Sequence, residues 1–322
     1  MIKDLIAKKI YNSLLEAKKV LLITHYSPDG DAAASLSAMT QILTQLKKDY
    51  TAYCADKFEN KLSWLPGLAG ALSRETELKF AEFDLIITLD CGTLSRTRLA
   101  EKIKTRQAYQ QLIEIDHHEP LEKVADLELR LPEAASTTEV IYDWLKINRL
   151  PIDARLAEAI LVGLVTDTGN FLYSATSNKA LVIAAEMISL GANWPKIVKT
   201  AKTSADLATA KLWGIALSRL KVNQHYQVAF TVITADDLKA LGLNDEATEG
   251  LPGFLSRLND VKAILVLKET AYGMIKGSWR ACQDGIDVAK LSNYLGGGGH
   301  VKAAGFSFPG RLKPAAKGWV IE

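Results

Sequence analysis

Short apolar runs alternate with longer helical patterns along the first half of the chain. The apolar runs at 20–24, 50–55, 85–90 and 111–116 are predicted strands. Apolar residues at helical spacing follow the first run over 32–48, and they return over 153–166 and over 177–191. Strands that alternate with helices are typical of a mainly parallel sheet covered by helices. The pattern therefore predicts an α/β domain.

A second unit follows a weakly patterned helical stretch, which we interpret as the connection between two domains. The predicted strands of this unit are 227–233, 263–269 and 272–280, and a predicted helix at 287–295 precedes a cluster of glycines. The chain has 322 residues, which is more than a single domain usually holds. We therefore expect a catalytic domain at 1–191, a helical linker at 192–220 and a smaller α/β domain at 221–322.

Composition and charge narrow the classes of function. Hydrophobic residues make up 48% of the chain and charged residues 24%, as in ordinary globular proteins, so extended disorder is not expected. The formal net charge of +2 comes from 39 basic and 37 acidic residues. Proteins that hold long nucleic acids usually carry a larger basic excess. The balance therefore favours a small or short anionic ligand over long nucleic acid.

The N-terminal segment and the cysteines bear on the compartment. Residues 1–20 mix acidic with apolar positions and predict an amphipathic helix, not a signal peptide. No apolar run approaches the ~18 residues of a membrane span. Cys54, Cys91 and Cys282 are widely spaced, which favours reduced thiols over a disulfide framework or a structural zinc site. A cytoplasmic protein without a membrane anchor is expected.

Side chains that can bind metals follow the predicted strands. The carboxylates and imidazoles that come directly after the first, third and fourth of these strands are His25, Asp29, Asp31, Asp90, Asp116, His117 and His118. In open α/β sheets the ligand crevice lies outside the carboxyl ends of the strands. Three separate segments therefore bring these groups to one edge of the predicted sheet. Asp167 adds a further carboxylate at the end of the predicted helix at 153–166.

Each motif alone has an ordinary structural explanation. Pro-Asp-Gly-Asp at 28–31 is strong turn chemistry, Asp90 could cap a helix, and Asp167 could shape a turn. Together, however, so many carboxylates at close range would repel one another unless cations neutralise them. Oxygen and imidazole ligands without thiolate suit Mn²⁺ or Mg²⁺ better than a closed zinc site. The number of candidate ligands favours two ions.

Four segments resemble the motifs of the DHH phosphoesterase superfamily. These segments are THYSPDGDAAAS, LIITLDCGT, LIEIDHH and LVTDTGNF, and LGGGGHVKAAGF at 295–306 is similar to the signature of the associated DHHA1 domain. Within the superfamily the chain most resembles the nanoRNase group, whose members hydrolyse very short RNA and small phosphorylated nucleotides such as 3′-phosphoadenosine 5′-phosphate (pAp). The resemblance implies an active-site cleft between a DHH and a DHHA1 domain.

The resemblance also implies a role for each matching residue of the first domain. The implied metal ligands are His25, Asp29, Asp90 and Asp167 for one ion, and Asp31, Asp90, His117 and Asp167 for the other. His118 would face the substrate phosphate, and Asp116 would support the adjacent histidines. Arg96 would lie near the phosphate. Two divalent ions are expected, with Mn²⁺ preferred to Mg²⁺.

The glycine cluster of the second domain is expected to bind phosphate or nucleotide. Gly296 to Gly299 are more glycines than a helix cap needs, although a flexible hinge is the simpler alternative. Glycines let the backbone approach a phosphate closely, and His300 can donate to an anionic oxygen. The expected substrate contacts of this domain are Gly297, Gly298, Gly299, His300, Lys276, Ser278 and Arg280. The last three alternate along a predicted strand and so share one face.

Departures from the family pattern leave the preferred substrate open. Ala34 precedes Ser35 where the family often has glycine, Thr93 stands where close relatives frequently have a second aspartate, and an asparagine after the two histidines is missing. None of these positions is an expected metal ligand. The alternatives are a linear or cyclic dinucleotide (c-di-AMP type) phosphodiesterase, a single-strand DNA exonuclease, an inorganic pyrophosphatase and a nucleotide sensor without activity. Whether the protein forms a homodimer is left open.

Overall fold

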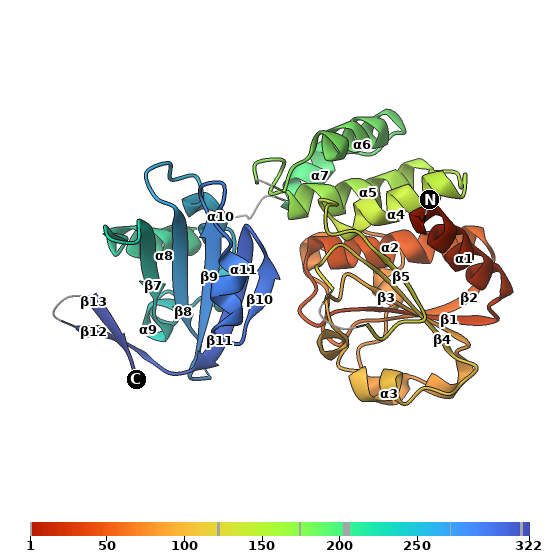
Figure 1. Cartoon of the computed structure of the whole chain (residues 1–322), viewed down its shortest axis with the longest axis horizontal. Helices are drawn as coiled ribbons and strands as arrows, with labels where there is room; N and C mark the ends of the chain where they lie inside the picture. Colours follow the sequence, from red (N-terminus) through yellow and green to blue (C-terminus); the bar gives the residue numbers. More distant parts are fainter. Residues whose placement is uncertain (1, 121–122, 174, 202–206, 271, 316–317) are drawn as a thin grey trace. The chain divides into compact units, whose positions relative to one another are not determined.

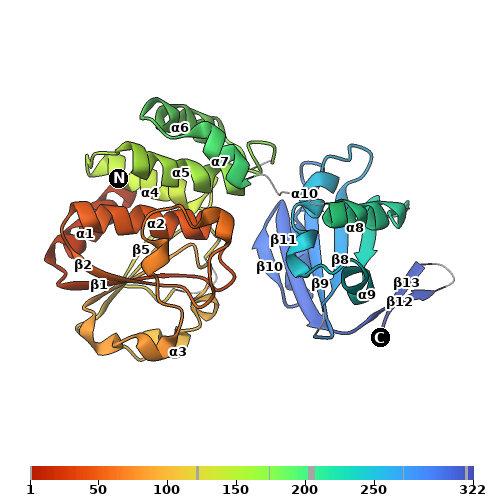
Figure 2. The same cartoon turned by 180° about the vertical axis from the view of Figure 1, so that it is seen from behind.

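A computed structural model of the chain describes residues 2–120, 123–173, 175–201, 207–270, 272–315 and 318–322. The chain divides into two compact units, Met1–Lys202 and Thr203–Glu322, each with its own sheet (Figures 1 and 2). Among the described residues, no helix is both long enough and apolar enough to cross a membrane.

The first unit contains the predicted strands and helices of the first half of the chain. Its strands are β1 (Lys19–Thr24), β2 (Asp49–Tyr53), β3 (Leu85–Leu89), β4 (Gln111–Asp116) and β5 (Leu127–Arg130). Its helices are α1 (Ile2–Glu16), α2 (Gly30–Gln45), α3 (Ala100–Lys104), α4 (Thr137–Ile147), α5 (Ala154–Asp167), α6 (Asn178–Ser189) and α7 (Trp194–Ala201). Short 3₁₀ turns lie at Asn60–Leu62, Leu68–Gly70, Glu75–Glu77, Phe80–Glu82 and Leu94–Thr97. Our predictions did not include β5 or α4.

The sheet of the first unit is parallel, as expected. Its strand order is β2-β1-β3-β4-β5. The chain therefore leaves β1 toward one edge of the sheet and returns to β3 on the other side. The neighbouring carboxyl ends of β1 and β3 form a topological switch point, which is where open α/β sheets bind their ligands.

Side chains of β1 alternate between two apolar cores. Val20 and Leu22 pack in the core that contains the residues of α2, α4 and α5, whereas Leu21 and Ile23 pack in the core that contains Ile103 of α3. Figure 1 shows α2, α4 and α5 on one face of the sheet and α3 on the other. Burying each of these aliphatic side chains contributes about 1.5–3 kcal/mol, so the central strands are a rigid base for the loops at their ends.

The second unit is built on a mixed sheet. Its strands are β6 (Lys221–Asn223), β7 (Val228–Ile233), β8 (Ala263–Glu269), β9 (Met274–Ala281), β10 (Gly298–His300), β11 (Ala303–Pro309), β12 (Leu312–Ala315) and β13 (Gly318–Ile321). Its helices are α8 (Leu207–Ser218), α9 (Ala235–Ala240), α10 (Leu251–Leu255) and α11 (Val288–Asn293), with a 3₁₀ turn at Asp245–Thr248. The main sheet has the order β10-β11-β9-β8-β7-β6, and β12 pairs with β13.

The structure divides the predicted linker at 192–220 between the two units. Helix α7 buries Ile197 in the core of the first unit, whereas α8 buries Leu212 and Ala216 in the core of the second. Residues 202–206 of the predicted linker lie outside the described residues. Each helix has an apolar face that needs a core to cover it, so both helices belong to compact units.

Candidate metal centre and active site

The loop after β1 places two carboxylates at the start of α2. Asp29 is the N-cap of this helix, because its Oδ1 accepts a hydrogen bond from the Ala32 N–H at 3.0 Å. The second oxygen, Oδ2, lies 3.7 Å from Nε2 of His25. Asp31 follows in the first turn and is fully buried. A Cβ on Gly163 of α5 would lie 2.3 Å from Asp31 Oδ1, so this glycine lets α5 approach the carboxylate.

Asp90 lies at the centre of the cluster. It follows β3 with a φ of +58°, a left-handed conformation that few residues other than glycine adopt and that is concentrated at functional sites. Its Oδ2 lies 3.8 Å from Nε2 of His25, and its Oδ1 lies 3.5 Å from Nε2 of His117. The Thr137 hydroxyl of α4 donates to the same Oδ1 at 2.9 Å. The Asp90 carboxylate is thus shared between two imidazoles.

Hydrogen bonds to backbone carbonyls orient both imidazoles. Nδ1 of His25 lies 2.7 Å from the carbonyl oxygen of Tyr26, and Nδ1 of His117 lies 3.3 Å from that of Ala134. Because a carbonyl can only accept, each Nδ1 carries the proton and each Nε2 presents a lone pair. Nε2 of His25 is buried and has no hydrogen-bond partner in the described part of the chain. An orphaned buried lone pair facing carboxylates fits a metal ligand.

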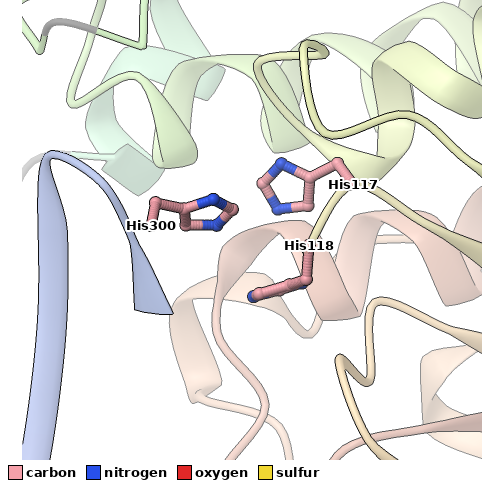
Figure 3. Close-up of side chains that lie close together, drawn as sticks. All are labelled: His117, His118 and His300. Carbon is pink, nitrogen blue, oxygen red and sulfur yellow. The ribbon is translucent and has the colours of Figure 1, made fainter. Parts of the chain in front are cut away.

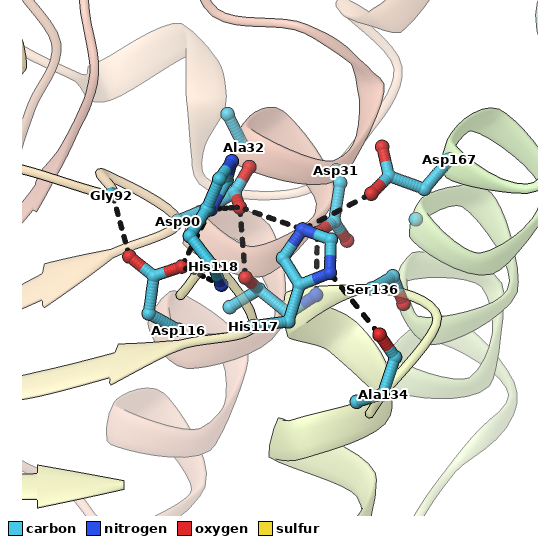
Figure 4. Close-up of polar contacts among 12 residues, drawn as sticks. Asp31, Ala32, Asp90, Gly92, Asp116, His117, His118, Ala134, Ser136 and Asp167 are labelled. Atoms are coloured by element: carbon cyan, nitrogen blue, oxygen red, sulfur yellow. Dashed lines mark hydrogen bonds and ion pairs between the residues drawn. The ribbon is translucent and has the colours of Figure 1, made fainter. Parts of the chain in front are cut away.

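Carboxylates from three separate elements, Asp31, Asp90 and Asp167, lie around His117 (Figure 4). Its Nε2 lies 3.2 Å from Oδ2 of Asp167, the last residue of α5. A carboxylate at the C-terminal end of a helix is unfavourable, because the helix dipole is negative there. Ligand atoms of His25, Asp29 and Asp90 lie within 4.8 Å of one another, and so do those of Asp31, Asp90 and His117. The structure therefore brings the predicted metal ligands together.

The electrostatics of the cluster favour a bound cation. Burial, followed by the charge of Asp29, raises the pKa of Asp31 to about 7, although backbone N–H groups of Thr137 and Thr138 act in the opposite direction. Burial and then the neighbouring carboxylates also raise the pKa of Asp90 and of Asp167 well above the usual range. Without a cation, the fold holds these carboxylates close together although their charges repel one another. A divalent metal ion would neutralise that repulsion.

The turn after β4, which contains Asp116, His117 and His118, orients His118 beside the cluster of carboxylates and imidazoles. Asp116 Oδ1 accepts the backbone N–H of His118 at 2.9 Å and lies 2.7 Å from Nδ1 of the same residue. Although burial alone would raise it, the bond from the His118 imidazole holds the pKa of Asp116 below its usual range. The rings of His117 and His118 meet edge to face with centroids 4.7 Å apart (Figure 3). The triplet thus holds His118 in one orientation beside His117.

The loop after β3 brings Arg96 to the same edge of the sheet. A Cβ on Gly92 would lie 3.5 Å from the His118 ring and 3.7 Å from Nη1 of Arg96, so these two side chains flank Gly92. Nη1 of Arg96 donates to the carbonyl of Cys91 at 3.4 Å. Arg96 and His118 lie beside the cluster of carboxylates and imidazoles. Together they form a surface suited to an anionic oxygen.

Comparison with known proteins identifies the family. Residues 19–164 match the family model described as the DHH family, N-terminal domain, and residues 223–318 match the DHHA1 domain model. The chain consists of a DHH domain followed by a DHHA1 domain. The two matches cover the two units of the structure, and they agree with the resemblance found in the sequence.

Curated relatives of this DHH protein align with it over most of the length of both proteins. It is 27% identical to a Streptococcus mutans protein named probable bifunctional oligoribonuclease and PAP phosphatase NrnA, over 89% of the chain and 88% of that protein. It is 25% identical to the Bacillus subtilis bifunctional oligoribonuclease and PAP phosphatase NrnA, over 89% and 88%. An exopolyphosphatase-related protein from Bacteroides fragilis has the same fold, with a TM-score of 0.84, 26% identity and coverage of 94% and 91%.

The DHHA1 unit places the other predicted residues on its sheet. Lys276, Ser278 and Arg280 alternate along β9 and share one face, as expected. They pair with Ser307, Gly305 and Ala303 of β11. On the neighbouring strand β8, the same face carries Ile264 and Val266, which pack against α8 and α10. The side chain of Lys276 is exposed, and those of Ser278 and Arg280 are half-buried. All three therefore lie outside the part of this face that α8 and α10 cover.

Part of the glycine cluster forms a strand and has a packing role. A Cβ on Gly297 would lie 2.0 Å from the carbonyl oxygen of Gly305, and one on Gly299 would lie 2.6 Å from that of Ala303. These two glycines are therefore required by the close pairing of β10 with β11. A Cβ on Gly298 would have only the Asn293 side chain nearby, at 3.8 Å. Packing does not explain Gly298, which leaves it as the glycine best placed to let a ligand approach.

The start of α4, which was not predicted from the sequence, supports Asp31. Asp31 accepts the backbone N–H groups of Thr137 at 2.6 Å and of Thr138 at 3.2 Å. Ser136 is the N-cap of this helix, and its Oγ accepts the N–H of Glu139 at 3.1 Å. A serine followed three residues later by glutamate, just before an apolar run, is a known helix-start signal and was visible in the sequence. The buried carboxylate of Asp31 is thus supported by a helix N-terminus.

Proposed function

We propose that this chain hydrolyses phosphate esters in short oligoribonucleotides and in pAp, using two divalent metal ions, with Mn²⁺ preferred to Mg²⁺. The observation that carries the proposal is the buried cluster in which His25 Nε2 faces Asp29 and Asp90 at 3.7 and 3.8 Å and has no hydrogen-bond partner within the described ranges of the chain. The NrnA relatives, named as oligoribonucleases and PAP phosphatases, support these substrates.

The ligand sets that the family resemblance implies are supported by the geometry of the cluster. The proposed ligands are His25, Asp29, Asp90 and Asp167 for one ion, and Asp31, Asp90, His117 and Asp167 for the other. Bound ions of this kind supply a hydroxide nucleophile near neutral pH and polarise phosphoryl oxygens. The protein holds the imidazoles in the required tautomer through the carbonyls of Tyr26 and Ala134. It holds the Asp90 carboxylate through the Thr137 hydroxyl.

His118 and Arg96 are proposed to contact the phosphate that is cleaved. With its Nδ1–H donating to Asp116, His118 has Nε2 on the opposite edge of the ring, where the imidazolium form can donate to a phosphoryl oxygen. Arg96 lies close to the same position beside Gly92, with Nη1 3.7 Å from where a Cβ of Gly92 would lie, and adds positive charge. Asp116 does not contact the substrate in this proposal, and it fixes the orientation of His118 instead.

The second unit is proposed to bind the remainder of the nucleotide. Lys276, Ser278 and Arg280 offer donors on one face of β9, and β10 presents His300 next to the backbone of Gly298 and Gly299. These are the groups that recognise phosphate and ribose oxygens. This proposed contact surface is short, which agrees with a substrate of a few nucleotides and with the small net charge.

A substrate panel tests the proposal. The protein with Mn²⁺ would be incubated with diadenylate, longer RNA, pAp, cyclic dinucleotides and pyrophosphate, and kcat/KM would be compared. We expect turnover of diadenylate and of pAp, with a steep fall as the RNA becomes longer. Turnover of cyclic dinucleotides or of pyrophosphate alone would contradict the proposed substrates. Metal binding without turnover of any of these compounds would favour a sensor.

A further inference from the structure

Arg130 is a buried cation beside the active-site turn. It ends β5, in register with Asp116 of β4, and only 6% of its side chain is exposed. Its Nη2 lies 2.6 Å from Oε1 of Glu114, and its Nη1 lies 3.7 Å from Oδ2 of Asp116. Arginine is seldom buried to this extent unless its charge is paired.

Arg130 and Asp116 hold the same two backbone segments from opposite ends. The N–H of Gly92 donates to Asp116 Oδ2 at 2.6 Å, and the carbonyl of Gly92 accepts from Arg130 Nη2 at 3.4 Å. The N–H of His118 donates to Asp116 Oδ1 at 2.9 Å, and the carbonyl of His118 accepts from Arg130 Nη1 at 3.0 Å. Gly92 and His118 are therefore each held by a hydrogen bond at the backbone N–H and by another at the backbone carbonyl.

The geometry of the Arg130–Glu114 pair argues against a purely stabilising role. Nε of Arg130 and Oε2 of Glu114 are both buried, and neither has a hydrogen-bond partner among the residues that the structure describes, so the two groups do not form a bidentate pair. The guanidinium is aimed at the carbonyls of Gly92 and His118 instead. A planar guanidinium can reach two carbonyls and a carboxylate at once, which a lysine ammonium cannot do in the same geometry.

The two segments that Arg130 holds carry the proposed phosphate contacts. One is His118 itself, and the other is the loop of Gly92, which Arg96 flanks. We propose that Arg130 is a positioning residue that fixes the His118 imidazole and the Gly92 loop relative to the metal cluster. This inference rests on the proposed function of the site, because His118 must act on the substrate for its position to matter.

The variant Arg130→Met, made together with Glu114→Gln, tests the role without leaving a buried charge unpaired. We expect kcat for diadenylate to fall about 10- to 100-fold, as for other residues that support a catalytic group, while the amount of bound Mn²⁺ is unchanged. In a His118→Ala background, the same pair of substitutions should lower kcat by a clearly smaller factor than in the wild type, because part of its effect passes through His118.

A matched control is Arg106→Met, on the same side of the sheet. Arg106 pairs with Asp126 at 3.1 Å, and it is 18% exposed. Its removal costs the chain an ion pair but leaves the Gly92 and His118 carbonyls in place. We expect an unchanged kcat. An equal loss of kcat in Arg106→Met and in the Arg130 variant would overturn the inference, and so would full additivity with His118→Ala.

A spectroscopic measurement separates this inference from the proposed function. The chain has 5 histidines, so the ¹⁵N-histidine spectrum of the metal-free protein is simple. We expect the Arg130 variant to shift the ring signals of His118 toward a mixture of tautomers and to leave those of His25 unchanged. Unchanged His118 signals would refute the positioning role even if the enzyme is active. A wild-type protein that hydrolyses none of the substrates would refute the function, while this spectrum would still test Arg130.

Discussion

Asp31→Asn should stabilise the metal-free protein at neutral pH while abolishing its stabilisation by metal. Asp31 is fully buried, and its pKa is raised to about 7 by burial and by Asp29. Asparagine has the same shape and keeps one acceptor for the N–H groups of Thr137 and Thr138. The substitution therefore removes a repelled charge without opening a cavity.

The expected size follows from the pKa of Asp31. A pKa that moves from 3.8 in the unfolded chain to about 7 in the folded protein costs roughly 4 kcal/mol at high pH, since each pH unit between the two values is worth ~1.4 kcal/mol. The unfolded chain binds fewer protons than the folded one, so stability falls as pH rises from about 4 through about 7. Losing one backbone hydrogen bond in the variant offsets about 1 kcal/mol of this.

The assay is thermal unfolding in EDTA at several pH values, repeated with saturating Mn²⁺. From pH 5 to pH 8 we expect metal-free wild type to lose about 2–3 kcal/mol relative to Asp31→Asn. With Mn²⁺ the order should reverse. Asp153→Asn, at the exposed N-cap of α5, is the control, and Mn²⁺ should stabilise this variant as much as it stabilises the wild type. A constant difference between wild type and Asp31→Asn across this range would refute the reasoning.

Three further substitutions test the site. Asp90→Ala should lower Mn²⁺-dependent turnover at least about a thousandfold, because metals contribute several kcal/mol to such reactions; near-normal rates would contradict the shared ligand. Thr137→Val removes the 2.9 Å bond to Asp90 and should weaken Mn²⁺ binding, measured calorimetrically, by about 10- to 100-fold; unchanged affinity would exclude this support. His300→Ala should raise KM for diadenylate roughly tenfold with kcat retained, since a charge-assisted hydrogen bond is worth about 1.5–3 kcal/mol. The control His225→Ala should leave KM unchanged. An unchanged KM in His300→Ala would refute the contact.

The parts of the fold that the sequence predicted are those set by local pattern. β1, β3 and β4 are short apolar blocks that are buried on both faces, and Asp153 and Ser177 precede helices as N-caps. Such signals depend on neighbouring residues alone. For the same reason, the edge of the sheet that carries the cluster was predictable from where the strands end.

The parts that were missed depend on contacts distant in sequence. β5 has the sequence LELR, and the side chain of its Arg130 is buried where it pairs with Glu114 of the neighbouring strand. The support of Asp31 by α4 joins residues 106 positions apart. The glycines at 297 and 299 were expected to serve a ligand, yet close strand pairing accounts for them. The spacing of residues along one sequence does not reveal which distant residues will be in contact.

The most direct test of the central claim is a titration of metal-free protein with Mn²⁺, in which bound metal and hydrolysis of diadenylate are followed together. Ligand sets that share Asp90 and Asp167 predict two bound ions per chain, and activity that appears only as the second site fills. Turnover that persists undiminished in EDTA, or full activity with a single bound ion, would contradict the account.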